Sequence, residues 1–234
     1  MDSSIIFSLI VIFSLLVSSE ACHPVDKEAL LHFKHQIIFD PYNLLQSWTL
    51  SSDCCTDWDG VSCDYSKRVV NMSRPGGLHS YMTGNLSSFL ANLSNLQHLD
   101  FSNLKDLKGP IPPEFGNLQN LETLVLSRNQ LSGPIPKSLG KLTKLRVLEL
   151  QGNGLSGNIP VELGDAKALT TILLSNNKLS GGIPENVMNL KNLKDFDVSG
   201  NSLSDRVPPH KAIFLHLHSK IVAVGHHLPI VNFR

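Results

Sequence analysis

The sequence lacks any excess of charge of one sign. Its 234 residues include 20 Lys and Arg and 20 Asp and Glu, which gives a formal net charge of zero and a pI near 7.1. No overall field draws such a chain toward nucleic acid or toward an anionic membrane surface. We therefore expect no nucleic acid among its partners.

The sequence also lacks an apolar run that could cross a membrane in the mature chain. Residues 5–17, IIFSLIVIFSLLV, are apolar over 13 positions, whereas a spanning helix needs about 20. Such a run near the N-terminus, followed by the small residues Ser19 and Ala21, is typical of a secretion signal. We predict a signal peptide at residues 1–21 and an extracellular mature protein. Because the first residues, MDSS, contain no Lys or Arg, the alternative is an uncleaved, membrane-associated segment.

Motifs for catalysis are missing too. No Ser, His and Asp share a pattern such as G-x-S-x-G, although the chain has 10 His. Five of these lie near the C-terminus without a carboxylate among them, which disfavours a metal cluster. They are His210, His216, His218, His226 and His227. We predict that the protein is not an enzyme and has no catalytic residue, metal or cofactor.

What the sequence does have is a period of 24 residues. Near-copies of one segment repeat L-x-x-L-x-L-x-x-N-x-L or a close variant of it, at residues 118–141, 142–165, 166–189 and 190–208. The Asn of each copy lies 24 positions after the last, at Asn129, Asn153, Asn177 and Asn201. Self-similarity at this period predicts a leucine-rich repeat solenoid, an α/β repeat fold that is right-handed. A chain with 41% apolar residues and this repeat forms one elongated domain, with no room for a second, catalytic one.

One copy shows why the same residues recur. A strand, a turn and a return limb wrap around a common core, so that six apolar side chains of the copy at 142–165 point inward. These are Leu145, Leu148, Leu150, Leu155, Ile159 and Leu163. Neighbouring copies bury this face by stacking, with parallel strands about 4.8 Å apart. A buried Asn side chain after each strand is expected to hydrogen-bond the backbone of adjacent coils.

The segment after each Asn reads L-S-G-x-I-P. Glycine there allows backbone angles that other residues avoid, and proline fixes φ and prevents an earlier start of a long convex helix. These residues are Gly133, Gly157 and Gly181, and Pro136, Pro160 and Pro184. This form resembles the plant extracellular class of leucine-rich repeats, over residues 22–208. That class includes polygalacturonase-inhibiting proteins, DNA-damage-toleration-type proteins and receptor-like protein ectodomains.

The repeat also explains a pattern that imitates a cofactor site. Gly152, Gly154 and Gly157 follow the segment VLEL and spell G-x-G-x-x-G. Pro160 stands where a phosphate-binding helix would run, and no acidic residue ends the next strand. We therefore interpret these glycines as part of the repeat.

An earlier copy, residues 93–117, is one residue longer than the others. Its position in the Asn column is then Lys105 or a displaced Asn103. This lengthened copy resembles the opening repeats of the polygalacturonase-inhibitor and toleration-protein branch. Residues 65–92 before it are predicted to form a degenerate first repeat.

Four cysteines remain once the signal is removed: Cys22, Cys54, Cys55 and Cys63. They allow three pairings, of which the bond between the adjacent Cys54 and Cys55 is strained. A metal site is disfavoured because C-x-x-C spacing is missing and export favours oxidation.

Residues 22–64 resemble the N-terminal cap of the plant class, with the pattern D-x-x-A-L-L-x-F-K, S-W and C-C-x-x-W-x-G-V-x-C-D. The matching residues are Asp26, Ala29, Leu30, Leu31, Phe33, Lys34, Ser47, Trp48, Cys54, Cys55, Trp58, Gly60, Val61, Cys63 and Asp64. The resemblance implies the pairs Cys22–Cys54 and Cys55–Cys63. We expect a cap helix with Asp26 as its N-cap and Leu30, Phe33 and Ile37 on one face, ending at Asp40-Pro41.

Three N-x-S sequons follow the cap, at Asn71, Asn85 and Asn92. In an exported chain they are predicted glycosylation sites, and glycans there would make that end a poor binding surface.

The predicted binding surface is the concave sheet, where alternate strand residues point away from the core. Three columns of such residues vary while their neighbours do not, so the fold leaves them free to specify a partner. The first is His98, Thr123, Val147, Thr171 and Asp195; the second Asp100, Val125, Glu149, Leu173 and Asp197; the third Ser102, Ser127, Gln151, Ser175 and Ser199. Val125 and Leu173 are apolar residues in a mildly acidic face, which is consistent with a protein or peptide ligand that has basic and apolar groups. The alternative is a solvated face without a ligand, which also applies to Asp195 and Asp197.

The resemblance implies a secreted, non-enzymatic recognition protein of the plant cell wall that inhibits a pathogen's polygalacturonase. A second hypothesis is a shortened receptor-like ectodomain that signals with a membrane kinase partner, and a third is a structural role in the wall. Residues 209–234 depart from the family, because the expected C-terminal cap with its cysteine pair is missing. We expect an atypical tail there that reflects truncation, rather than a segment folded over the last coil.

Overall fold

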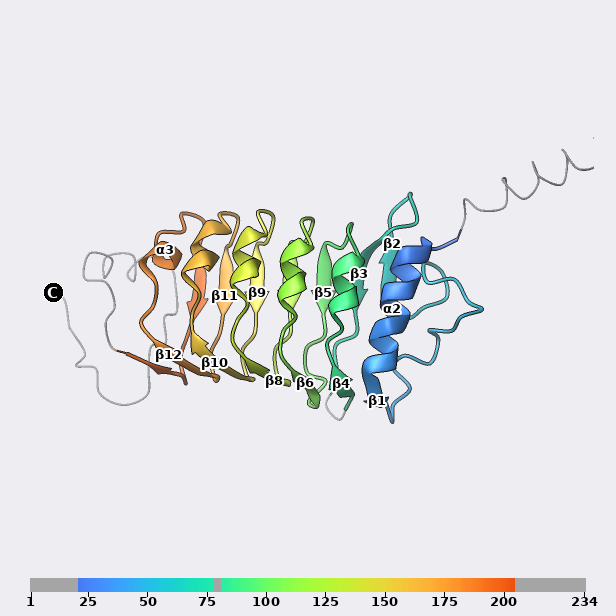
Figure 1. Cartoon of the computed structure of the whole chain (residues 1–234), viewed down its shortest axis with the longest axis horizontal. Helices are drawn as coiled ribbons and strands as arrows, with labels where there is room; N and C mark the ends of the chain where they lie inside the picture. The colour runs from blue at the N-terminus through green and yellow to red at the C-terminus, as the bar shows by residue number, and fades with distance from the viewer. Residues whose placement is uncertain (1–20, 78–80, 205–234) are drawn as a thin grey trace, which may run out of the picture.

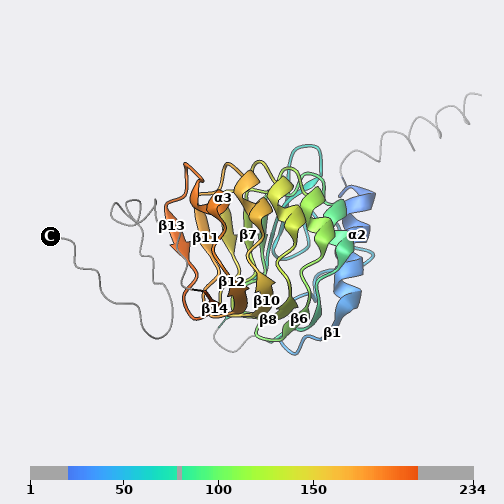
Figure 2. The ribbon, with the colours of Figure 1, turned by 60° about the vertical axis from the view of Figure 1, so that its left-hand side comes forward.

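The computed structural model describes residues 21–77 and 81–204. Residues 1–20 of the predicted signal peptide and the predicted tail at 209–234 lie outside the described residues. Figures 1 and 2 show short coils stacked side by side along one axis, with the helix α2 (Pro24–Gln36) at one end. The predicted leucine-rich repeat solenoid is confirmed.

Each coil contributes one strand to a sheet on the concave side. Its order is β13-β11-β9-β7-β5-β3-β2, and all neighbours are parallel except β2 and β3. The strands are β2 (Val61–Cys63), β3 (Val69–Ser73), β5 (His98–Asp100), β7 (Thr123–Val125), β9 (Val147–Glu149), β11 (Thr171–Leu173) and β13 (Asp195–Asp197).

The limb after each turn forms a second sheet, which was not among the elements expected from the repeat pattern. Its order is β1-β4-β6-β8-β10-β12-β14, with β1 antiparallel to β4 and the others parallel. The strands are β1 (Ile37–Phe39), β4 (Thr83–Asn85), β6 (Leu107–Gly109), β8 (Gln130–Gly133), β10 (Gly154–Asn158), β12 (Lys178–Gly181) and β14 (Ser202–Leu203). In β8 the strand ends at Gly133, whose φ of 77° suits glycine.

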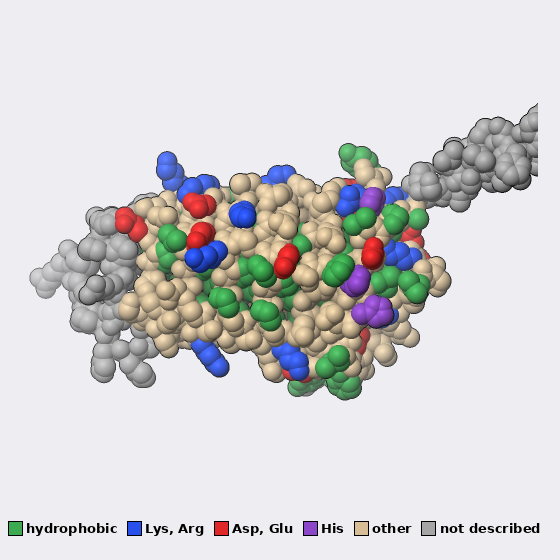
Figure 3. All heavy atoms as spheres, in the orientation of Figure 1, with side chains coloured by type: hydrophobic (Ala, Val, Ile, Leu, Met, Phe, Trp, Pro, Cys, Tyr) green, Lys and Arg blue, Asp and Glu red, His purple; other side chains and the backbone are tan. Residues whose placement is uncertain are grey.

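The third side carries one short helix per coil. These are the 3-10 helices η1 (Ser88–Asn92), η2 (Pro113–Asn117), η3 (Lys137–Lys141) and η4 (Val161–Asp165), and the α-helix α3 (Glu185–Met188). Close stacking here requires glycine, because a Cβ on Gly140 would lie 2.0 Å from the carbonyl oxygen of Glu162. Figure 3 shows apolar and charged side chains interspersed on this face.

The core follows the repeat as predicted. In the copy at 142–165, all six inward apolar side chains are buried, with an exposed fraction of 2% for Ile159 and 0% for the five leucines. Since one continuous cluster of buried residues runs from the cap to the last described coil, each coil completes the core of its neighbours.

The column of Asn side chains joins successive coils. Asn153 donates from Nδ2 to the carbonyls of Leu126 and Leu150, each at 3.0 Å, and its Oδ1 accepts from Leu131 N at 3.0 Å. Asn177 and Asn201 make the same three kinds of contact one and two coils further on. The amides therefore satisfy backbone groups that the turn leaves without strand partners.

This pattern ends at the lengthened coil. Asn129 donates to Phe101 O and Leu126 O, but its buried Oδ1 accepts no hydrogen bond within the described residues. One coil earlier, Asn103 donates from its side chain to the carbonyls of Gly76 and Gly77. Its backbone N–H donates to Ser127 O as that of Arg128 does to Gln151 O, so Asn103 occupies the position before the Asn column. The extra residue thus displaces Asn103 from the column.

Two predictions about the cap helix are wrong. The N-cap is His23, and Asp26 lies inside the helix with an exposed fraction of 0%. The helix ends at Gln36, before Asp40-Pro41, because Ile37–Phe39 pairs with β4 as strand β1. Ile37 is consequently half-buried in that strand, whereas Leu30 and Phe33 are buried on the helix.

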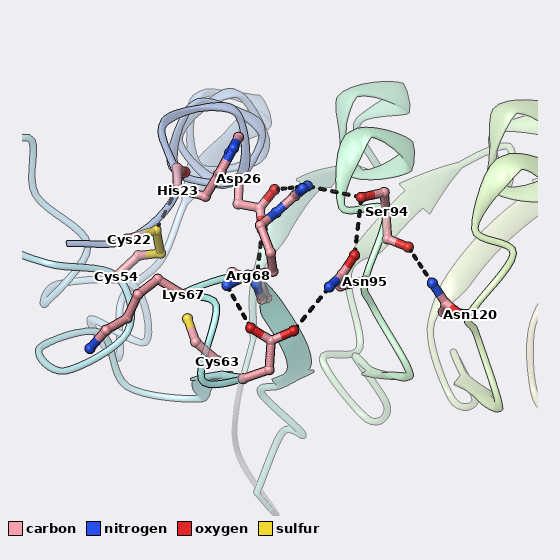
Figure 4. Close-up of polar contacts among 12 residues, drawn as sticks. Cys22, His23, Asp26, Cys54, Cys63, Lys67, Arg68, Ser94, Asn95 and Asn120 are labelled. Atoms are coloured by element: carbon pink, nitrogen blue, oxygen red, sulfur yellow. Dashed lines mark hydrogen bonds and ion pairs between the residues drawn. A yellow bond between two sulfur atoms is a disulfide. The ribbon is translucent and has the colours of Figure 1, made fainter. Parts of the chain in front are cut away.

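Asp26 instead fixes the cap to the first coil (Figure 4). Its two oxygens accept from Arg68 Nη2 at 2.7 Å and Arg68 Nε at 3.0 Å, and one also accepts from Val69 N at 2.8 Å. Arg68 reaches Ser94 Oγ at 2.9 Å, and Asn95 Nδ2 donates to Asp64 at 2.9 Å. A buried carboxylate requires such partners, since an unpaired buried charge is strongly destabilising.

Disulfides and aromatic rings complete the cap. Cys22 is bonded to Cys54 and Cys55 to Cys63, the pairing that the resemblance implies. Trp48 stacks on Trp58 with ring centroids 5.2 Å apart. Phe33 of the helix stacks on Phe101 of the lengthened coil at 4.7 Å, so the cap and the repeats share one core.

Candidate protein-binding surface

Five strands position the candidate surface: β5, β7, β9, β11 and β13. Their three-residue registers align without a shift, so that residues 24 or 25 positions apart lie side by side. The middle residue of each strand is buried, and the two flanking residues are exposed or half-buried. The structure therefore places the first and second predicted columns on the outer side of the concave sheet.

The third column differs from its prediction. Ser102, Gln151 and Ser199 are half-buried, but Ser127 and Ser175 each have an exposed fraction of only 5%. The prediction that these two serines face outward is wrong. The strands end two residues earlier, and the chain has begun to turn inward toward the Asn column at this point.

The surface is acidic at its two ends and in its middle. Within the three columns Asp100, Glu149, Asp195 and Asp197 supply carboxylates, and no position is Lys or Arg. Asp100 and Asp197 each accept from the backbone N–H two residues on, at Ser102 (2.9 Å) and Ser199 (3.0 Å). Such contacts fix the direction of both side chains.

The pKa of Asp197 reflects this environment. Burial alone would raise its pKa, but hydrogen bonds from the backbone and side chain of Ser199 and from Ser175 together lower it below the ordinary value. The carboxyl is therefore ionised at neutral and mildly acidic pH. Beside it in the second column lies Leu173, an apolar neighbour that is half-buried.

A further column of exposed or half-buried residues, directly before the strands, was not predicted from the sequence. Gln97, Glu122, Arg146, Thr170 and Lys194 each precede a strand, and the backbone N–H of each of the last four donates to the carbonyl of the one before at 2.8 Å. These positions are exposed or half-buried. The signal was present in the sequence, because the first x of each L-x-x-L also varies between copies.

Three cationic side chains surround a groove beside this column. The groove has a volume of about 570 Å³ and its lining comes from successive coils. The lining residues are Glu122, Thr143, Lys144, Arg146, Ala168, Thr170, Asn192 and Lys194. We call this feature the basic rim groove.

The sequons lie on three different sides of the first coils. Asn71 lies in β3 opposite His98 and so belongs to the first column of the concave sheet. Asn85 is exposed in β4 of the second sheet, and Asn92 is exposed at the end of η1. A glycan on Asn71 would cover the concave face at this end of the molecule.

The described residues were also compared with the requirements of a metal site and of a membrane-spanning helix. In the described part of the chain, the one group of three potential metal ligands within reach of each other is Cys22, Cys54 and Cys55, and these sulfurs belong to the disulfides. The described residues include no helix with the length and hydrophobicity that a membrane crossing requires.

Comparisons with known proteins agree with this architecture. Residues 23–64 match the family described as "Leucine rich repeat N-terminal domain", and residues 112–155 match "Leucine rich repeat". A further repeat family matches residues 95–118 and 168–190. The matches thus include the cap and the regular coils.

Among curated relatives, "Leucine-rich repeat protein FLOR 1" of Arabidopsis thaliana is 41% identical over 128 residues, which are 55% of this chain and 37% of the relative. A polygalacturonase inhibitor of Pyrus communis is 35% identical over 127 residues, 53% of this chain and 37% of the inhibitor. The match thus spans little more than a third of the length of these relatives.

Among solved structures, a chain of the BIR3–SERK2 complex from Arabidopsis thaliana is 32% identical, with a TM-score of 0.65. The similarity covers 76% of this chain and 94% of that one. The chain therefore belongs to the plant leucine-rich repeat proteins, a family that includes polygalacturonase inhibitors and receptor ectodomains.

Proposed function

We propose that the chain is a secreted, non-enzymatic protein that binds a protein partner on its concave face and inhibits a polygalacturonase of a plant pathogen. The observation that carries the proposal is the pair of aligned outward columns on β5 to β13. Their side chains vary between coils while the buried middle residues stay apolar. A surface of this kind offers specific contacts without disturbing the fold.

The chemistry of the columns supports a protein partner. Carboxylates at Asp100, Glu149 and Asp197 alternate with Val125 and Leu173 along the second column. A partner with basic and apolar groups at matching spacing would complement this surface. Inhibition needs only that the bound protein blocks the substrate cleft, so it requires no catalytic residue in this chain.

The sequence and the cap support an extracellular location. Two disulfides close the cap, and disulfides persist in oxidising compartments. Together with the signal-like residues 5–17 and the sequons, they favour secretion into the cell wall. The division into a signal peptide, a cap at 22–64, a first repeat at 65–92, regular repeats at 93–208 and a tail is part of the same proposal.

The test is inhibition of purified polygalacturonases. The secreted chain should slow at least one enzyme of a panel from plant pathogens, with inhibition that saturates at one chain per enzyme. No effect on any enzyme of the panel would contradict the proposed inhibition.

A second candidate is a receptor-like ectodomain that acts with a membrane kinase. It is favoured by the similarity to a chain of the BIR3–SERK2 complex, which extends over 94% of that chain. A binding assay with purified ectodomains of receptor kinases would distinguish this function from inhibition of a polygalacturonase. Specific binding to one of them, without inhibition of any polygalacturonase, would support this second function.

A further inference from the structure

The basic rim groove borders the concave sheet but carries the opposite charge. Lys144, Arg146 and Lys194 line it, and Glu122 is the one carboxylate in its lining. The three columns beside it contain carboxylates and no Lys or Arg. The binding side therefore divides into an acidic sheet and a basic rim.

The cations of the groove are available to a ligand. Within the described part of the chain, no ion pair joins residues of the groove; Arg68–Asp26, Lys137–Glu162 and His32–Glu28 lie elsewhere. Lys144 Nζ donates to the neutral Asn120 Oδ1 at 2.7 Å. Arg146 and Lys194 are exposed, and neither side chain makes an ion pair with another of the described residues.

The cations are held in a regular arrangement. The backbone of residue 146 is hydrogen-bonded to that of Thr170, and Thr170 to Lys194, each at 2.8 Å. Arg146 and Lys194 thus lie two coils apart, at roughly 10 Å for a strand spacing of about 4.8 Å. Thr170, which lies between them and also lines the groove, donates its hydroxyl to Arg146 O at 3.0 Å.

We propose that the basic rim groove binds an acidic polypeptide segment of the same partner that covers the concave sheet. This rests on the proposed function and adds the charge pattern of the partner. Arg146 and Thr170 immediately precede Val147 and Thr171 of the first column, so a protein seated on the sheet reaches the groove without a gap. The partner then presents a basic and apolar surface bordered by an acidic segment.

A labelled octaglutamate peptide is the probe, and its binding to the full secreted chain is measured by fluorescence anisotropy at low and at physiological salt. Binding should weaken as salt rises. The double variant Arg146→Glu with Lys194→Glu should bind the peptide about tenfold less tightly, since each reversal removes an attraction and adds a repulsion. The matched control is Lys108→Glu with Lys178→Glu, which makes the same charge change on exposed positions of the second sheet.

Equal loss of binding in both double variants, at unchanged melting temperatures, would overturn the proposal, as would no binding of the peptide by the parent chain. An oligogalacturonide of equal charge that binds more tightly than the peptide would also overturn it, in favour of a polysaccharide site. Peptide binding is measured without any enzyme. If the parent chain binds the peptide but inhibits no polygalacturonase, the result counts against the proposed function. If it inhibits an enzyme but does not bind the peptide, the result counts against this inference alone.

Discussion

At the scale of single residues, the fold depends on half-buried and buried polar side chains that hydrogen-bond to the backbone or to a charged partner. Asn153 makes three hydrogen bonds with two coils, and Asp26 accepts two from Arg68 and one from Val69, at the start of β3. Removal of either side chain should therefore lower the free energy of unfolding, because it leaves buried hydrogen-bonding partners unsatisfied.

Replacement of Asn153 by Ala is expected to lower the free energy of unfolding by about 1–3 kcal/mol. It leaves Leu131 N without an acceptor and two carbonyls without a donor. Asn129→Ala is the matched control, because Asn129 donates similarly but its Oδ1 accepts nothing among the described residues. Urea denaturation should show a loss smaller by about 1 kcal/mol for the control. Equal losses would contradict the role given to Oδ1.

Asp26→Asn is expected to destabilise the chain by about 3–5 kcal/mol, because it leaves the Arg68 guanidinium without its charged partner. Glu28→Gln on the same helix removes a carboxylate that is 70% exposed, and its effect should stay within about 0.5 kcal/mol. Thermal denaturation of both variants measures the difference. A small effect of Asp26→Asn would show that the cap does not depend on this pair.

The stability contributed by Asp64 should depend on pH. Burial would raise its pKa, but hydrogen bonds from Asn95, from the backbone of Arg68 and Ser66, and the Arg68 charge lower it below the ordinary value. A lowered pKa in the folded state means that the stabilisation is present above about pH 4 and is lost as the pH falls through the folded-state pKa. The melting temperatures of the parent and Asp64→Asn, measured from pH 7 to pH 2, should therefore converge on acidification. A constant difference would contradict this.

At the scale of elements, the cap differs from the coils in what holds it together. The coils rely on stacking, whereas the cap adds two disulfides and the pair of Trp48 and Trp58. Because the cap shares its core with the lengthened coil through Phe33 and Phe101, its loss would expose the first coils to solvent.

Removal of either disulfide by paired Cys→Ser substitution is expected to cost about 2–5 kcal/mol. Cys22–Cys54 closes 32 residues and Cys55–Cys63 closes 8, so the first should cost about 1 kcal/mol more by its larger effect on the unfolded chain. Calorimetry of the two double variants tests the order. A larger loss of stability for the disulfide that closes the shorter loop would indicate that local packing, rather than chain entropy, determines the order.

The elements also show what the sequence could predict. Repeat spacing identified the concave strands and their buried leucines, because identical copies can only bury their apolar face by stacking in register. The contacts of the cap helix could not be predicted in the same way, because the role of Asp26 depends on Arg68, which is 42 residues away in the sequence. Likewise, burial of Ser127 and Ser175 depends on where each strand ends, and strand ends are not fixed by the alternation of side chains.

At the scale of the whole molecule, the described coils form one stack, and the proposed binding side has two differently charged parts. The acidic columns lie on the sheet, the basic rim groove lies beside them, and the sequon at Asn71 marks the end near the cap. The missed column at Glu122, Arg146 and Lys194 shows that the surface offered to a partner is wider than the strand alternation alone indicates.

The measurement that tests the central claim most directly compares inhibition of a susceptible polygalacturonase by two charge-matched variants. One is Glu149→Lys with Asp195→Lys on the concave sheet, and the other is Glu114→Lys with Asp165→Lys at exposed positions of the short helices η2 and η4. The concave variant should raise the inhibition constant at least about tenfold, and the helix-face variant should leave it within about twofold. Equal effects of the two variants, or a larger effect on the helix face, would contradict recognition by the concave sheet.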